Sequence, residues 1–413
     1  TGLRYEVTIT TYTDACNGCA DRCEMPINWG DGTTGTLPRI NGPNGSCPSG
    51  ARMGELTANP NIRKNVYRAE HSYPSSGTYI LSTEDPNRNA GVSNIQNSVD
   101  VPFYIQSELY ISPGLGPNTS PVLTYPPIDD GCAGERFEHN AGAYDPDGDS
   151  LAYQLVPCRT TGGQLLPDIY DVEDSVYIDP ITGDLIWDVP QNVGVFNFAF
   201  QIVEYRKNAR GEYVRVGYVT RDIQIDINGN CLHKPPIIDP VGPFCIEAGK
   251  TLSFAVTATD PDGQQVTLSA FGAPFADELP EDKATFNTAT VKPSVTSTFS
   301  WKTNCDHVRL RPYQVNFRAE DVPPPSTNGS PLVDLYPTEI RVIAPSPKNP
   351  VATGAQNVIN LHWNPSICSD AIGYRIYRRR GSYGFVPGPC ETGVPEYTGY
   401  AFLDSTIALN DTA

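Results

Sequence analysis

The turn Asp145-Pro146-Asp147-Gly148-Asp149 occurs a second time as Asp260-Pro261-Asp262-Gly263-Gln264. Each copy lies between two runs in which apolar side chains alternate with polar ones. Around the second copy the alternating apolar residues are Leu252, Phe254, Val256 and Ala258 before the turn and Val266, Leu268 and Ala270 after it. Because a period of two is typical of a half-buried strand, and Pro, Asp and Gly favour turns, each copy is predicted to join two strands.

The sequences around the two turns repeat as well. Trp187 follows the first turn and Trp301 the second at an offset of 114 residues, while the turns themselves are 115 residues apart. Each unit closes on an alternating apolar segment, which is 221–227 in the first unit and 338–343 in the second. A near-constant offset of this size indicates two tandem copies of one module.

The composition favours strands over helices. The 413 residues include 39 Pro and 36 Gly, and short β-rich runs recur between turn residues while helix-period stretches are scarce. The length allows several domains, each with its own core. The predicted fold class is therefore all-β, with tandem immunoglobulin-like β-sandwich modules joined by short Pro-rich linkers.

Charge, hydropathy and missing motifs limit what the chain can do. A formal net charge of −18 would repel the phosphates of nucleic acid, so nucleic acid is not predicted as a partner. No apolar run reaches the ~20 residues of a membrane-spanning helix, so no membrane span is predicted in this segment. The sequence has no Gly-x-Ser-x-Gly, no His-Glu-x-x-His and no phosphate-binding glycine loop, and we predict that it is not an enzyme.

Eleven cysteines fall into local groups, which predicts disulfides within modules and an oxidising compartment. The disulfide candidates are Cys16, Cys19, Cys23 and Cys47; Cys132 and Cys158; Cys245 and Cys305; and Cys368 and Cys390. Cys231, at a module junction, is predicted to be left over. The first four cysteines could instead bind zinc, but two disulfides pinning a long hairpin fit this composition better.

The first turn is the primary candidate metal site. Asp145, Asp147 and Asp149 stand at alternate positions, where their carboxylates can face one cation, as Ca²⁺ requires. The alternative is purely structural, because Pro fixes φ and Asp-Gly supplies a turn whether or not a metal binds.

The second turn offers a weaker metal site. Asp260 and Asp262 are retained, but Gln264 stands where the first copy has its third aspartate. The segment 319–321 aligns with 203–205 in the repeat. These segments contain the carboxylates Glu204, Glu320 and Asp321. They could supply additional oxygen ligands or, alternatively, be solvated strand ends.

Linkers rich in Pro and Gly divide the chain into four predicted modules. They are module 1 (1–117), module 2 (118–230), module 3 (231–344) and module 4 (345–413). In module 1, Trp29-Gly30-Asp31-Gly32 followed by His71-Ser72-Tyr73 resembles the PKD-type immunoglobulin-like module of bacterial surface proteins.

The other modules resemble families of the same kind. Modules 2 and 3 combine the acidic turn, a Trp strand and a closing strand, and they resemble the cadherin-like and putative immunoglobulin repeats of large bacterial surface proteins. Such modules commonly hold calcium at the seam between neighbours. In module 4, segments 357–363 and 372–379 resemble two strands of a fibronectin type III module, of which about a third is missing from this sequence.

Taken together, the module order resembles the amino-terminal region of Bacteroidetes cell-surface proteins of the gliding-motility-associated type, which use type IX secretion. The resemblance implies a non-catalytic extracellular stalk or adhesive region at the bacterial cell surface, stiffened by disulfides and Ca²⁺. Its expected partners are other cell-surface or secretion-machinery proteins, or surface glycans. Asp174-Ser175-Val176 resembles an O-glycosylation signal of such proteins, which makes Ser175 a candidate glycosylation site.

Two other functions remain open from the sequence. One is a carbohydrate-binding or accessory region of a secreted polysaccharide-degrading enzyme, which would require exposed aromatic rings along one face. The other is a filament subunit whose last sandwich accepts a strand from a neighbour.

Overall fold

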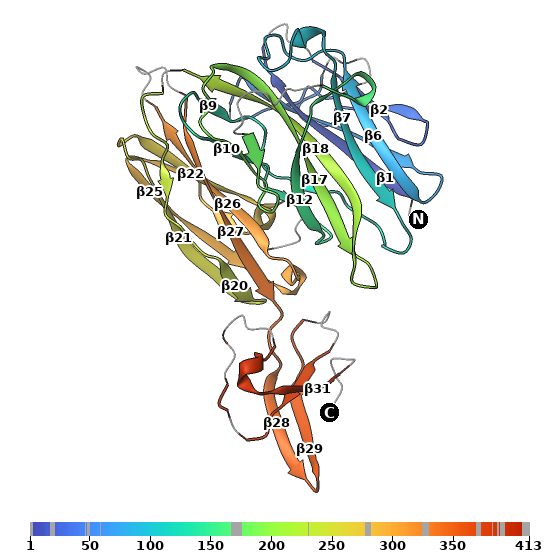
Figure 1. Ribbon diagram of the computed structural model, residues 1–413, viewed down its shortest axis with the longest axis vertical. Helices are drawn as coiled ribbons and strands as arrows, with labels where there is room; N and C mark the ends of the chain where they lie inside the picture. Colours follow the sequence, from blue (N-terminus) through green and yellow to red (C-terminus); the bar gives the residue numbers. More distant parts are fainter. Residues whose placement is uncertain are drawn as a thin grey trace.

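The computed structural model of the chain describes residues 3–16, 21–45, 47, 50–57, 59–166, 176–229, 231–276, 282–323, 330–368, 373–381, 383–385, 388 and 393–406. Within these residues the chain consists of strands and connecting loops, with only single turns of 3₁₀ helix (Figure 1). The 3₁₀ turns are η1 (Ser98–Asp100), η2 (Thr161–Gly163), η3 (Ala273–Phe275), η4 (Cys305–His307) and η5 (Glu396–Thr398). The predicted fold class, all-β with tandem immunoglobulin-like sandwiches, is confirmed.

Module 1 consists of two facing sheets. One sheet contains β1 (Arg4–Asp14), β4 (Glu55–Leu56) and β5 (Ile62–Ser72), in the order β1-β5-β4. The other contains β2 (Glu24–Asn28), β3 (Thr34–Pro38), β6 (Gly77–Asp85) and β7 (Phe103–Ile111). Alternate residues of these strands, among them Ile27, Leu37 and Tyr67, point inward and form one apolar core.

Module 2 has the same two-layer construction. Its strands are β8 (Val122–Leu123), β9 (Asp130–Cys132), β10 (Phe137–Asn140), β11 (Ala143–Tyr144), β12 (Ser150–Val156), β13 (Arg159–Thr160), β14 (Gln164–Leu165), β15 (Val176–Ile178), β16 (Asp184–Trp187), β17 (Gly194–Lys207) and β18 (Tyr213–Asn228). The sheet β10-β16-β15 packs on the strands β12-β17-β18 through a core around Trp187, Phe198 and Phe200.

Modules 1 and 2 share a sheet. Strand β18 pairs with β7 through Gly217 opposite Leu109 and Tyr218 opposite Glu108, so ten strands from the two modules form one sheet. A Cβ at Gly217 would lie 2.5 Å from the main-chain oxygen of Glu108, so the strands could not approach this closely with a larger residue. The two modules therefore lie side by side (Figure 1).

Module 3 repeats the plan of module 2. Its strands are β19 (Ile237–Ile238), β20 (Phe244–Glu247), β21 (Thr251–Thr259), β22 (Gln265–Gly272), β23 (Thr285–Phe286), β24 (Ala289–Val291), β25 (Ser294–Lys302), β26 (Tyr313–Val322) and β27 (Val333–Ile343). They form the sheets β19-β21-β25-β23 and β20-β27-β26-β22-β24. The run β22-β26-β27 corresponds to β12-β17-β18, and Trp301 is fully buried as Trp187 is.

Module 4 is much less covered. It contains β28 (Lys348–Ala355), β29 (Val358–Asn364), β30 (Arg375–Arg378) and β31 (Ala401–Ser405), paired as two separate two-stranded sheets. Every residue of β28 and of β31 is exposed. The division of the chain at the four predicted boundaries remains a proposal.

The disulfides depart from the predicted pairing. Cys132 pairs with Cys231, the first residue of module 3, because the parallel pairing of β9 with β18 brings the two ends of module 2 together. The pairing of Cys132 with Cys158 is therefore wrong, and Cys158, not Cys231, is the buried free thiol.

A second correction concerns the last two modules. Cys305 of module 3 pairs with Cys368 of module 4, so neither the Cys245–Cys305 nor the Cys368–Cys390 pairing is correct. Cys16 and Cys245 also form disulfides; Cys19 and Cys390 lie outside the described residues. Both the Cys132–Cys231 bond and the Cys305–Cys368 bond consequently join neighbouring predicted modules covalently.

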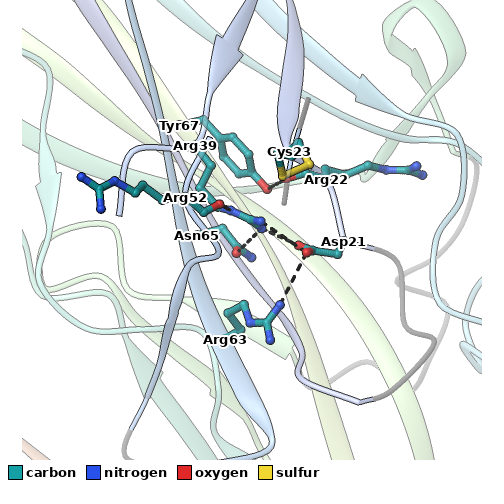
Figure 2. Close-up of a disulfide and its surroundings, with 9 residues drawn as sticks. Asp21, Arg22, Cys23, Arg39, Arg52, Arg63, Asn65 and Tyr67 are labelled. Carbon is teal, nitrogen blue, oxygen red and sulfur yellow. Dashed lines mark hydrogen bonds and ion pairs between the residues drawn. A yellow bond between two sulfur atoms is a disulfide. The ribbon is translucent and has the colours of Figure 1, made fainter. Parts of the chain in front are cut away.

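Module 1 has its own disulfide, between Cys23 and Cys47 (Figure 2). Beside it, the fully buried guanidinium of Arg39 donates to Asp21, to the Asn65 side chain and to the main-chain oxygen of Arg52. This bond uses two of the four thiols of the zinc alternative, which the structure therefore does not support.

Candidate cation site at the first acidic turn

The first acidic turn connects β11 to β12. The amide of Asp149 donates to Asp145 Oδ1 at 2.9 Å, and Gly148 adopts a φ of +81°, which L side chains rarely adopt. This closure places the three aspartates on one side of the turn, and one ligand oxygen from each of Asp145, Asp147 and Asp149 lies within 4.8 Å of the others. The predicted acidic cluster therefore exists.

Arg206, near the end of β17, already binds this cluster. Its Nε lies 2.9 Å from both carboxylate oxygens of Asp149, and its Nη2 lies 2.6 Å from Asp149 Oδ2 and 2.9 Å from Asp147 Oδ2. Such multiple contacts between a guanidinium and a carboxylate are among the stronger charge-assisted hydrogen bonds in proteins. Hydrogen bonds to Asp149 and burial act in opposite directions on Arg206, and the net effect raises its pKa.

The same guanidinium holds the linker that enters module 2. Nη1 donates to the main-chain oxygens of Leu115 at 3.0 Å and Pro117 at 2.7 Å, and Nη2 donates to Asn118 Oδ1 at 2.7 Å. The amide of Thr119 donates in turn to Asp147 Oδ2 at 2.6 Å. We call residues 115–119, the turn 145–149, Glu204 and Arg206 the first seam.

Two carboxylate oxygens on the inner side of the first seam have no hydrogen-bond partner. They are Asp145 Oδ2 and Glu204 Oε1, and both side chains are almost completely buried. Glu204 receives one hydrogen bond, from Asn118 Nδ2 at 2.6 Å. Burial, followed by the neighbouring aspartates, raises the pKa of Asp145 to about 6 and that of Glu204 to about 8.

The second acidic turn has the same backbone but different side chains. Its closing bond, from the Gln264 amide to Asp260 Oδ1, is 2.6 Å long, and the Lys234 amide donates to Asp262 Oδ2 at 2.7 Å, as Thr119 does to Asp147. Here His233 occupies the sequence position of Asn118, and its Nε2 lies 3.1 Å from Asp321 Oδ2.

Strand register identifies the remaining equivalents. Leu151 and Val266 are each the second residue of the strand that follows the acidic turn. Glu204 lies opposite Leu151 in the first unit, and Asp321 lies opposite Val266 in the second. Asp321, not Glu320, is therefore the counterpart of Glu204, and Pro323 stands where the first unit has Arg206. Glu320 pairs instead with Arg318. We call residues 232–234, the turn 260–264 and Asp321 the second seam.

These contacts decide how well the first turn suits calcium. Asp145, Asp147 and Asp149 are oxygen ligands of the right kind, but Arg206 holds two of the three and brings a permanent positive charge to them. Like charges repel, so a divalent cation and this guanidinium do not fit the same place. In the second turn Asp260 Oδ2 and Gln264 Oε1 have no partner, but Asp260 and Asp262 belong to no group of three ligand residues in the described part of the chain.

Sequence reasoning missed Asn118, His233 and Arg206. The offset of 115 residues that relates the turns also relates Asn118 to His233, and this signal was available. Arg206 lies two residues after Glu204, on the same face of β17, but nothing in a single sequence indicates that it reaches the turn. Ser175, the candidate glycosylation site, lies outside the described residues.

Comparison with known proteins adds little beyond the fold. No protein family and no curated protein matches the chain. Among solved structures, domains A168–A170 of titin share 10% identity over 71% of this chain and 87% of theirs, at a TM-score of 0.20. Human protocadherin-24 EC1-2 shares 14% identity over 55% of this chain and 98% of its own, at 0.19. The sialic acid binding region of a Streptococcus sanguinis adhesin shares 13% identity over 56% of this chain and 81% of its own, at a TM-score of 0.22. Scores this low carry no argument about function.

The described residues contain no helix that is long and apolar enough to cross a membrane.

Proposed function

We propose that this chain is a non-catalytic, extracellular structural or adhesive region of a large bacterial cell-surface protein, in which modules 1 to 3 act as one rigid block. The disulfides are typical of proteins that fold in an oxidising compartment. The gliding-motility and type IX secretion assignment rests on the sequence resemblance alone and belongs to the same proposal. Its partners would be other surface proteins or glycans.

The observation that carries the proposal is how the modules are joined. Between modules 1 and 2, the shared sheet is supplemented by Arg88 and Asp222, a buried ion pair with a distance of 2.8 Å. Flexibly linked domains usually meet through small polar surfaces. A shared ladder of main-chain hydrogen bonds is a much stronger constraint on relative motion.

Modules 2 and 3 are joined by a buried polar network. Asp129 of module 2 lies 2.9 Å from Arg318 Nη2 of module 3 and 2.7 Å from His139 Nδ1, and all three side chains are buried. Beside them Tyr125 stacks on Phe271 with ring centroids 4.5 Å apart. Because separating the modules would expose or orphan these charges, the junction favours one orientation.

Module 4 is attached differently, through the Cys305–Cys368 bond and a Pro-rich linker. Small-angle X-ray scattering on the wild-type chain and on Cys305→Ser with Cys368→Ser tests the arrangement. We expect one rigid conformation of modules 1 to 3 to fit both data sets, with module 4 sampling more orientations in the variant. Scattering that requires several orientations among modules 1 to 3 of the wild-type chain would refute the rigid block.

Calcium would stiffen the junctions between modules only at a site where oxygen ligands are free to bind the ion. The first turn binds Arg206 instead, so we expect the wild-type block to be rigid without Ca²⁺. Measuring the melting temperature in millimolar Ca²⁺ and in chelator checks this, and a large Ca²⁺-dependent rise would restore calcium to the mechanism.

Strand exchange is a second candidate function, favoured by the exposure of module 4. Its apolar residues that remain exposed include Val351, Val358, Ile359, Phe402 and Leu403. Exposed apolar strands are a template for pairing with another chain. If a neighbouring copy supplies a strand, light scattering should show a mass that rises with protein concentration, whereas the structural-block proposal predicts a constant monomer mass.

The carbohydrate-binding alternative gains no comparable support. Of the exposed tyrosines, Tyr213 is already in contact with Lys207, 5.0 Å from its ring centroid, and with Arg311, which donates to its hydroxyl. Titration with sugar oligomers, followed by tyrosine fluorescence, would revive this function if it showed saturable binding.

A further inference from the structure

The acceptors around Arg206 resemble the ligand set of a hard divalent cation. They are two carboxylates, Asp147 and Asp149, one side-chain amide oxygen, from Asn118, and the main-chain oxygens of Leu115 and Pro117. Carboxylate, amide and main-chain oxygens are the ligands that Ca²⁺ takes in proteins. The guanidinium thus makes contacts to both sides of the first seam that an ion would otherwise make.

Two buried carboxylate side chains of the first seam each have an oxygen that accepts no hydrogen bond. Asp145 Oδ2 and Glu204 Oε1 have no hydrogen-bond partner, although Asp145 is 3% exposed and Glu204 is 0% exposed. Buried carboxylates are normally paired or coordinate a metal. Arg206 binds Asp147 and Asp149 but makes no hydrogen bond to either of these two oxygens.

We propose that Arg206 is a resident cation that takes the place of a divalent ion in the first seam, and that removing its side chain opens a latent divalent-cation site there. The ligands would be the carboxylates of Asp145, Asp147 and Asp149, with Glu204 and Asn118 beside them. This inference goes beyond the rigid-block function, which does not depend on it.

A guanidinium differs from an ion in one important respect. Arg206 is covalently part of β17 and its guanidinium stays charged at physiological pH, so this cation cannot dissociate from the protein. The linker 115–119 therefore stays bound to module 2 whatever the calcium concentration of the surroundings. The second seam has the uncharged Pro323 in the position equivalent to Arg206 and serves as an internal comparison.

The test compares the wild-type chain with Arg206→Ala in chelator and in millimolar Ca²⁺. We expect the wild-type melting temperature to be the same in both conditions. In chelator, the variant should melt at a lower temperature, and amide exchange in 115–119 should rise about tenfold, because Thr119 loses its ordered acceptor. Calcium should reverse both effects in the variant, and terbium luminescence should report one additional bound ion.

Two controls separate the possible explanations. Arg210→Ala removes a cation from the exposed loop between β17 and β18 and should change neither quantity. Arg206→Ala combined with Asp145→Asn and Asp149→Asn should lose the calcium rescue, which shows that these carboxylates bind the ion.

Three results would overturn the inference. They are calcium stabilisation of the wild-type chain equal to that of Arg206→Ala, failure of calcium to restore slow exchange in 115–119 of a variant that is folded by circular dichroism, and rescue that persists in the triple variant. Scattering that still fits a rigid block in any of these cases would leave the proposed function standing while removing this inference.

Discussion

The junction between modules 1 and 2 and the junction between modules 2 and 3 solve the same problem with different interactions. The first uses main-chain pairing of β7 with β18 and the Arg206 contacts to the linker. The second, within the described strands, shares no ladder and relies on Asp129, His139 and Arg318. The main-chain pairing of β7 with β18 does not titrate, and the raised pKa values of Asp145 and Glu204 in the first seam favour the folded state as the pH falls. Asp129 acts in the opposite direction, so the two junctions should respond differently to mutation and to acid.

The largest effect is expected at the second junction. Arg318→Met leaves Asp129 buried without its cationic partner, and breaking a buried ion pair in this way costs about 3–5 kcal/mol. Urea unfolding should show this loss, and hydrogen exchange should show it first in β26. The double variant with Asp129→Asn should recover part of the stability. A loss below about 1 kcal/mol would mean that the network contributes little to the junction.

Acid should also separate the two junctions. Burial would raise the pKa of Asp129, but the Arg318 guanidinium and His139 outweigh it and lower the pKa to about 2. A carboxylate with a lowered folded-state pKa stabilises the fold above its unfolded-state value, and this stability is lost as the pH falls from about 4 to about 2.

The expected loss from this group is about 2 kcal/mol. Burial lowers the pKa of His139. Its contribution to the free energy of unfolding is therefore also lost in acid, beginning as the pH falls through the ordinary pKa of histidine. Unfolding free energies measured at pH 7 and pH 3 check the sign, and Asp129→Asn should flatten the difference. Hydrogen exchange in acid would contradict this comparison if it showed that the β7–β18 pairing opens before the second junction.

The smallest effect should come from making the second seam resemble the first. Gln264→Asp combined with Pro323→Arg restores the third carboxylate and a guanidinium at the equivalent positions. We expect a gain of at most about 1 kcal/mol, because a partly exposed ion pair offers no more. Slower exchange of the Lys234 amide would be the local sign of success, and unchanged exchange would show that the two seams are not interchangeable.

The repeat was readable from the sequence because its markers are local. Alternating apolar residues, the acidic turns and the paired Trp residues all report on nearby chain, and they predicted the strands and the two related sandwiches. The shared sheet was not predictable in this way, since nothing in the neighbourhood of Leu109 indicates that Gly217 lies opposite it. Pairings between distant strands depend on the packing of whole modules.

The counterpart of Glu204 shows that an alignment error of one residue changes which side chain is assigned to the site. Aligning it with Glu320 is wrong by a single residue, yet a shift of one residue moves a side chain to the opposite face of a sheet. The offset between the two units grows from 115 residues at Leu151 and Val266 to 117 at Glu204 and Asp321, so a constant offset fails here and the strand pairing identifies Asp321.

Outside module 1, where the Cys23–Cys47 bond lies within its predicted group, the cysteine pairings failed for the same reason. Closeness in sequence suggested Cys132 with Cys158, but the bonded partner is Cys231, 99 residues away. Chain separation says little about distance once strands return to the same edge of a sandwich.

The bond between Cys305 and Cys368 has a mechanical consequence. It encloses β26, β27, the linker to module 4, β28 and β29 in a covalent loop with a sequence separation of 63 residues. A pull applied to the chain on both sides of the loop passes through the sulfur atoms and not through these strands. About 200 Å of extended chain is thereby withheld from tension, and it is released only if the bond is reduced.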